Sequence, residues 1–208
     1  MSDKLSDNLG FHHRYVVGND PTRPPLLLLH GTGGDENDLL GLGAQVAPGA
    51  SLLSPRGKVV ENGMPRFFRR LAEGVFDEAD VRARANELAD FVMAARDAYG
   101  IDAPIALGFS NGANIAAALL WLRPEVLAGA VLLRAMRPLS TPPEAGIGGR
   151  RVLIVNGAAD PLIPAKDSVA FAQTLTDAGA SVELEVLPAG HGLTQADLGL
   201  VQRHLAQA

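Results

Sequence analysis

The sequence contains no cysteine, no excess of basic residues and no long apolar run. Without cysteine, disulfides, thiolate metal sites and a cysteine nucleophile are excluded. The formal net charge is −5, from 18 basic and 23 acidic residues, which gives no basic footprint for nucleic acid. The longest apolar run, residues 115–122, is far too short to span a bilayer. We therefore expect no nucleic-acid partner and no membrane insertion.

What the sequence does contain is typical of a globular protein. It has 208 residues, 47% of them hydrophobic and 20% charged, which predicts a single domain over residues 1–208. Residues 1–8 are polar and carry no apolar signal core. Together with the absence of cysteine, this favours a cytoplasmic protein. A homodimer is left open.

Short apolar runs alternate along the chain with patterns of helical period. Most of the runs are continuous rather than alternating, which indicates strands covered on both faces. Strands are predicted at residues 26–29, 50–53, 105–109, 130–133, 152–155 and 182–187, and helices at 81–99, 112–122, 164–178 and 193–206. This order predicts an α/β fold with a mainly parallel central sheet and helices on both faces. Functional groups are then expected at the carboxyl ends of the strands.

A nucleophile is predicted at Ser110. Residues 108–112 read Gly-Phe-Ser-Asn-Gly, a G-x-S-x-G motif directly between a predicted strand and a predicted helix. Such a turn exposes the serine hydroxyl at a helix N-terminus, where negative charge is stabilised. The alternative is a serine that only caps the helix.

A serine hydroxyl needs a base, and the base needs a carboxylate to orient it. His191 follows a predicted strand, between two glycines, and is the predicted base. Asp160, also after a strand, is the predicted carboxylate, which gives the order Ser, Asp, His of α/β-hydrolases. Of the remaining histidines, His12 and His13 are expected to be exposed or in an N-terminal edge strand, His30 near the site and His204 on the surface of the last helix.

Two N–H groups are needed to stabilise an oxyanion. One is predicted on Asn111, directly after the nucleophile, and the other on Thr32 in the glycine loop 31–34, with Gly31 and Gly33 as alternatives. A phosphate-binding loop is a poorer interpretation, because the Walker lysine and the third glycine of a dinucleotide motif are absent. A tight turn that caps a helix is the remaining alternative.

Four motifs together resemble the phospholipase/carboxylesterase family of α/β-hydrolases, and within it a bacterial branch of predicted esterases. They are residues 29–35 (LHGTGGD), 108–112 (GFSNG), 157–161 (GAADP) and 190–192 (GHG). The resemblance extends from about residue 11 onward and implies an α/β-hydrolase fold with a minimal lid that hydrolyses carboxylic esters. Members commonly have Gln where Asn111 stands and Leu where Thr32 stands; both changes keep the backbone donors.

Residues 56–70 hold five basic side chains and one acidic one. The dipeptide Asn62-Gly63 predicts a hairpin turn within this segment. In one interpretation Phe67 or Phe68 lines an acyl cavity and an arginine, such as Arg66, receives a substrate carboxylate or phosphate. In the other, the arginines pair with surface acids and the phenylalanines pack below.

The predicted function is that of a serine carboxylesterase acting on small or medium acyl esters through an acyl-enzyme, with a small-molecule ester as partner and with neither metal nor organic cofactor. A lysophospholipase or acyl-thioesterase with the same three residues is one alternative. A non-catalytic ligand-binding protein of the same fold is another.

Overall fold

The computed structural model describes residues 3–6, 9–142 and 146–207. The remaining residues of the polar segment 1–8, residues 143–145 and residue 208 of the predicted domain lie outside the described part.

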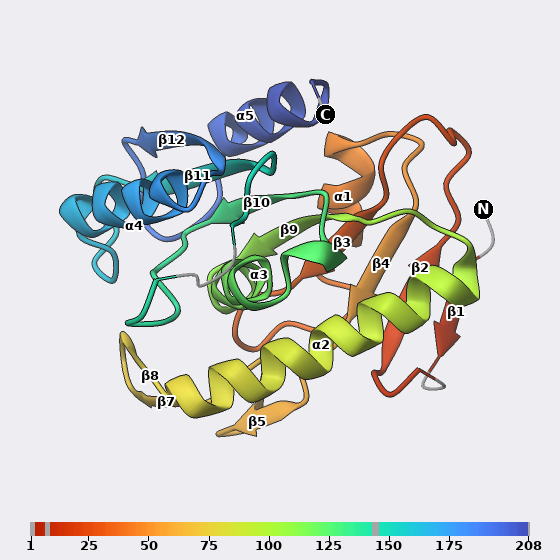
Figure 1. Cartoon of the computed structure of the whole chain (residues 1–208), viewed down its shortest axis with the longest axis horizontal. Helices are drawn as coiled ribbons and strands as arrows, with labels where there is room; N and C mark the ends of the chain where they lie inside the picture. Colours follow the sequence, from red (N-terminus) through yellow and green to blue (C-terminus); the bar gives the residue numbers. More distant parts are fainter. Residues whose placement is uncertain (1–2, 7–8, 143–145, 208) are drawn as a thin grey trace.

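An eight-stranded sheet forms the centre of the molecule, in the order β1-β2-β4-β3-β9-β10-β11-β12 (Figure 1). The pairs from β4 through β12 are parallel, whereas β1–β2 and β2–β4 are antiparallel. The mainly parallel sheet is therefore confirmed. Its strands are β1 (Asp3–Ser6), β2 (His13–Val16), β3 (Leu26–Leu29), β4 (Leu52–Pro55), β9 (Ile105–Phe109), β10 (Gly129–Leu133), β11 (Arg151–Gly157) and β12 (Ser181–Leu187).

Helices cover both faces of the sheet. They are α1 (Leu40–Val46), α2 (Glu78–Tyr99), α3 (Asn111–Leu122), α4 (Ala165–Asp177) and α5 (Gln195–Leu205), with a 3₁₀ turn at Pro124–Val126. One apolar core lies under α2, α3 and α4, and a second lies under α1 and α5. Leu27 and Leu29 of β3 face the first core, while Leu26 and Leu28 face the second. Because successive side chains of a strand point to opposite faces, both must be apolar, which explains the continuous runs.

Two small hairpins lie beside α2 at the bottom of Figure 1. The first pairs β5 (Val59–Glu61) with β6 (Met64–Arg66), and the second pairs β7 (Arg70–Ala72) with β8 (Val75–Phe76). The turn of the first contains Asn62 and Gly63 with φ of 52° and 78°. This positive-φ pair is the hairpin turn that the Asn-Gly dipeptide predicts.

The predicted long elements are present, with shifted ends. β4 begins two residues later than expected, and β11 and β12 are longer. α2 begins three residues earlier, at Glu78, with Asp77 as its N-cap. The short elements β1 and α1 were not predicted. β2 agrees with the edge-strand alternative for His13, which is buried rather than exposed. Glycine lowers helix propensity, and α1 contains both Gly41 and Gly43, so its sequence gives little helical signal. No helix in the described part of the chain is long and apolar enough to cross a bilayer.

Candidate active site

Ser110 lies at the sharp turn between β9 and α3. Its φ of 53° and ψ of −116° are strained for a residue with a side chain. Both glycines of the motif are needed because neighbouring backbone lies too close for a side chain. A Cβ on Gly108 would lie 2.5 Å from the Gly112 carbonyl oxygen, and a Cβ on Gly112 would lie 1.9 Å from the Leu29 carbonyl oxygen. The motif thus packs the start of α3 directly against β9 and β3, with Ser110 at the carboxyl end of the sheet.

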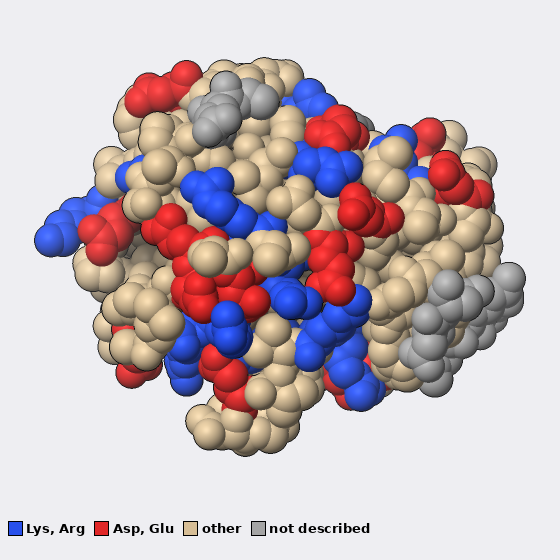
Figure 2. All heavy atoms as spheres, turned by 60° about the horizontal axis from the view of Figure 1, so that its bottom comes forward, with Lys and Arg blue, Asp and Glu red and all other residues tan. Residues whose placement is uncertain are grey.

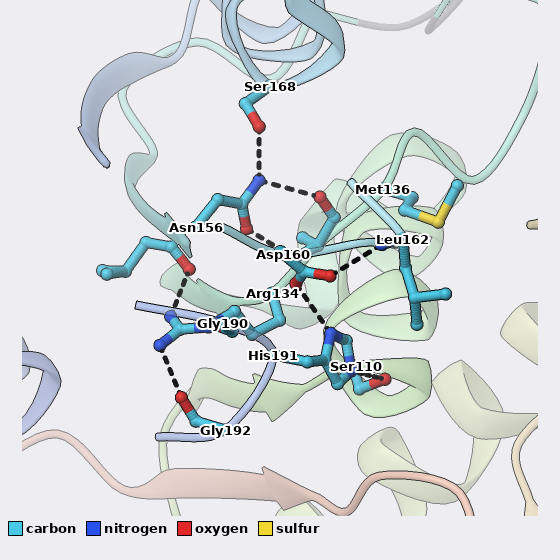
Figure 3. Close-up of polar contacts among 12 residues, drawn as sticks. Ser110, Arg134, Met136, Asn156, Asp160, Leu162, Ser168, Gly190, His191 and Gly192 are labelled. Carbon is cyan, nitrogen blue, oxygen red and sulfur yellow. Dashed lines mark hydrogen bonds and ion pairs between the residues drawn. The ribbon is translucent and has the colours of Figure 1, made fainter. Parts of the chain in front are cut away.

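Ser110, His191 and Asp160 form a hydrogen-bonded chain (Figure 3). His191 Nε2 lies 2.9 Å from Ser110 Oγ, and His191 Nδ1 lies 2.7 Å from Asp160 Oδ2. A carboxylate only accepts hydrogen bonds, so Nδ1 carries the ring proton and Nε2 accepts from the serine hydroxyl. In this tautomer the ring can take the hydroxyl proton when the serine oxygen attacks. The structure therefore brings together the three side chains that the sequence reasoning selected.

The loops that carry the carboxylate and the histidine are hydrogen-bonded to each other. Ala158 N–H donates to the Leu187 carbonyl at 2.7 Å, and Ala159 N–H donates to that of Ala189 at 3.0 Å. Asp160 is buried, and its other carboxylate oxygen, Oδ1, accepts a hydrogen bond from the Leu162 N–H at 2.9 Å. Because β11 and β12 are adjacent and parallel, both loops emerge at the same edge of the sheet.

Arg134, at the end of β10, holds the histidine loop from both sides (Figure 3). Its Nε donates to the Gly190 carbonyl at 3.0 Å and its Nη2 to that of Gly192 at 2.9 Å. Nη1 donates to the Val155 carbonyl, and both Nη atoms reach the Asp197 carboxylate, at 2.7 and 3.0 Å. All five guanidinium donors are thus paired although the side chain is fully buried. Sequence reasoning missed this residue, because nothing in the sequence places Arg134 near His191.

The N–H groups of the glycine loop after β3 differ in whether they have a hydrogen-bond partner. Gly33 N–H donates to the Pro65 carbonyl and Gly34 N–H to that of Gly31. Thr32 N–H has no acceptor among the residues that the structure describes. Asn111 N–H belongs to the first turn of α3, where N–H groups have no partner within the helix. Of the two alternatives to Thr32, the hydrogen bonds therefore speak against Gly33, whereas Gly31 stays open.

His30 supports this loop rather than reaching the serine. Its Nδ1 donates to the Gly31 carbonyl at 2.7 Å, and its Nε2 accepts from the Gly57 N–H at 2.9 Å. Burial lowers the pKa of the His30 ring. The ring is therefore held neutral, in the one tautomer that satisfies both contacts.

A small cavity of about 60 Å³ lies beside Ser110. Thr32, Asn111, Arg66 and Phe76 contribute to its lining, together with Ser110 and His191.

Phe67 and Phe68, expected as candidates for an acyl cavity, are not part of this lining; they are 3% and 0% exposed and belong to the core under α2 and α3. Phe76, which the sequence reasoning did not select, lies at the cavity in their place.

The basic side chains of residues 56–70 each have an acidic partner. Arg56 pairs with Glu36, Lys58 with Glu87, Arg66 and Arg70 with Glu61, and Arg69 with Asp77. This agrees with the second interpretation of the segment, in which arginines pair with acids and phenylalanines pack below. Arg66 is the exception in one respect: it is 3% exposed and also lines the cavity.

The expectation of a surface position for His204 was wrong. The ring is 4% exposed and packs between α5 and β12, where Nδ1 lies 3.3 Å from Glu183 Oε2. The apolar periodicity predicted that residue 204 lies in a helix, but it did not predict that this residue faces the sheet.

Across residues 3–6, 9–142 and 146–207 no group of three or more His, Asp or Glu side chains is arranged to hold a metal ion.

A mainly parallel sheet with helices on both faces and a serine at a strand-to-helix turn defines an α/β-hydrolase. The sequence matches the phospholipase/carboxylesterase family over residues 12–208, and the chain belongs to that family.

Among its relatives, the putative hydrolase MhqD of Bacillus subtilis (strain 168) is 48% identical over 172 residues, 82% of this chain and 86% of that protein. The carboxylesterase of Bacillus cereus is 44% identical with a TM-score of 0.90, covering 93% of this chain and 92% of that one. A carboxylesterase from Mesorhizobium loti is 32% identical with a TM-score of 0.93 over the whole of both chains.

Proposed function

We propose that this ester-hydrolysing enzyme acts through Ser110, His191 and Asp160 by two-step acyl transfer. The observation that carries the proposal is the continuous hydrogen-bonded chain from serine hydroxyl to imidazole to carboxylate. A serine hydroxyl is a weak nucleophile at neutral pH, and this chain supplies the base that it requires.

In the first step Ser110 Oγ attacks the ester carbonyl carbon while His191 Nε2 takes the hydroxyl proton. The carbonyl oxygen becomes an oxyanion, which accepts hydrogen bonds from the N–H groups of Thr32 and Asn111. Asp160 holds the ring and stabilises the imidazolium. The imidazolium then gives its proton to the leaving alcohol as the carbon–oxygen bond breaks, and the acyl group remains on Ser110.

In the second step water replaces the alcohol. His191 takes a proton from the water as its oxygen attacks the acyl carbon, and the same N–H groups stabilise the second oxyanion. The proton returns to Ser110 Oγ when the acyl group leaves as a carboxylic acid. The proton that leaves Ser110 Oγ ends on the alcohol, and one from water restores the serine hydroxyl, so both steps balance.

A fluorophosphonate probe tests the proposal directly, because it forms a covalent bond only with an activated serine. Native protein should be labelled and should hydrolyse p-nitrophenyl esters. Ser110→Ala should lose both properties. Ser181→Ala is a matched control, since Ser181 is an exposed serine at the amino end of β12, whereas the site lies at the carboxyl ends of the strands, and both properties should persist. Native protein that is neither labelled nor active would instead support the non-catalytic binding alternative.

A further inference from the structure

Two buried N–H donors beside Ser110 have no acceptor. They are Arg66 Nε and Asn111 Nδ2, and each belongs to a residue that is 3% exposed and lines the small cavity. The orientation of the Asn111 amide is fixed, because its Oδ1 accepts from the Phe67 N–H at 2.8 Å. The nitrogen is therefore the atom left over. Buried donors without partners are rare and costly, so two of them on residues that line one cavity require an explanation.

The missing partner must be an acceptor, and charge favours an anionic one. Both free groups only donate hydrogen bonds, and the guanidinium is always positively charged. Hydrogen bonds between a guanidinium and an anionic oxygen are roughly twice as strong as neutral ones. A carboxylate presents two such oxygens.

The charged side chains that line the cavity also favour an anionic group. Arg66 and Arg70 both line the cavity and share a single acid, since Glu61 Oε2 lies 2.8 Å from Arg66 Nη1 and 3.8 Å from Arg70 Nε. Glu73 also lines the cavity but is exposed, so water screens its charge far more than that of the buried Arg66. Arg134 is already neutralised by Asp197.

Basic and acidic side chains are mixed across the face turned forward in Figure 2, with no broad patch of one charge. Recognition of an anionic group therefore depends on the side chains that line the cavity itself.

We propose that the cavity beside Ser110 binds a carboxylate of the substrate, so that the enzyme prefers short esters that carry a free carboxylate group. Arg66 Nε and Asn111 Nδ2 donate to its oxygens, and Arg70 supplies a second positive charge at the opening. The volume of about 60 Å³ limits the bound group to a few heavy atoms. The preference rests on the proposed function, because it concerns the substrates of the same serine.

Pairs of isosteric esters measure the preference. Monomethyl succinate is compared with methyl 4-methylpentanoate, which replaces a carboxylate by an isopropyl group in the acyl part. Acetoxyacetate is compared with isobutyl acetate, which makes the same replacement in the alcohol part. We expect kcat/KM to favour the anionic member of at least one pair by about tenfold, the size of one charge-assisted hydrogen bond.

Variants then assign the preference to residues. Arg66→Lys keeps the charge but removes the Nε donor, and Arg70→Gln removes the second cation at a more exposed position that tolerates change. Both should lower the anionic-to-neutral ratio of kcat/KM, Arg66→Lys to near one. Arg69→Gln is the matched control: this neighbouring arginine is exposed and pairs with Asp77, outside the cavity, so the ratio should stay within about twofold.

A binding measurement completes the test without turnover. Succinate should inhibit competitively and raise the Tm of native protein more than sodium chloride of equal ionic strength does, and Arg66→Lys should reduce both effects. Neutral esters that are hydrolysed as fast as their anionic partners in both pairs would overturn the inference and leave the proposed function intact. A ratio that Arg69→Gln lowers as much as Arg66→Lys would also overturn it. Absent probe labelling would contradict the proposed function instead.

Discussion

The two sides of the site differ in how completely their polar groups are paired. On the histidine side (Arg134, Asp160, His191, Asp197), every guanidinium donor and both carboxylates have partners. On the hairpin side (Thr32, Arg66, Arg70, Asn111), a backbone N–H and two side-chain donors have none among the described residues. One side is complete without a ligand, and the other offers donors to one.

This difference matches the two tasks of an acyl-transfer site. A base has to be held in one tautomer and one orientation throughout the reaction, which needs a rigid and satisfied network. Donors to an oxyanion or a substrate group must be free until that group arrives. Burial makes both arrangements strong, because water does not compete with the contacts.

The largest effect is expected from breaking the histidine side at Asp160. Asp160→Asn keeps the size of the side chain but can no longer enforce the tautomer of His191, and kcat should fall by about 10⁴-fold. Asp167→Asn, at an exposed aspartate in the first turn of α4, is the control and should retain nearly full activity. Steady-state kinetics on p-nitrophenyl acetate measures both, and an Asp160→Asn enzyme with a tenth of native kcat would contradict the role of Asp160.

A smaller effect, on stability, is expected at Arg134. Arg134→Met leaves Asp197 buried without its counter-ion, so the free energy of unfolding should fall by about 3–5 kcal/mol. Adding Asp197→Asn should recover part of the loss, because a neutral amide needs no counter-ion. Arg123→Gln breaks a pair with more exposed partners and should cost at most about 1 kcal/mol. Urea unfolding measures the free energy of unfolding of each variant. Equal losses in Arg134→Met and Arg123→Gln would contradict the larger contribution expected of the buried Arg134–Asp197 pair.

The smallest effect is expected in the pH dependence of stability, where His30 and Asp197 should contribute over different pH ranges. Burial holds the pKa of His30 below its unfolded value, so its contribution to stability is complete above about pH 6.5 and declines as pH falls below that value. Burial alone would raise the pKa of Asp197, but hydrogen bonds from Arg134 and Thr194 outweigh it and lower the pKa. Its contribution is therefore present above about pH 4 and lost below it. The contacts of His30 with Gly31 and Gly57 should therefore weaken at higher pH than the Arg134–Asp197 pair of the histidine side.

Unfolding free energies between pH 8 and 3 test this order. His30→Gln should remove part of the decline below pH 6.5, where one histidine contributes a slope of at most about 1.4 kcal/mol per pH unit. The rest of the decline belongs to groups such as His204, whose pKa burial also lowers. A decline in His30→Gln as steep as in native protein throughout would contradict the assignment to His30.

Local signals predicted more of the site than of its surroundings. Ser110 was found because a short motif lies between a strand and a helix, and the Asn62-Gly63 turn because the dipeptide itself favours positive φ. Phe67 and Phe68 could not be assigned, because apolar side chains fit a core and a substrate cavity equally well. Arg134 had no sequence signal, since its partners lie far along the chain on two other loops and α5.

By itself, the sequence determined the alternation of strands and helices, the turn that carries Ser110 and the loops that carry Asp160 and His191. These features depend on apolar periodicity and on residues within a few positions of one another. Only the tertiary structure decided which donors stay free and which are paired. That choice depends on groups as far as 81 residues apart meeting at one edge of the sheet, as Ser110 meets His191, and on burial, which removes the water that would otherwise satisfy them.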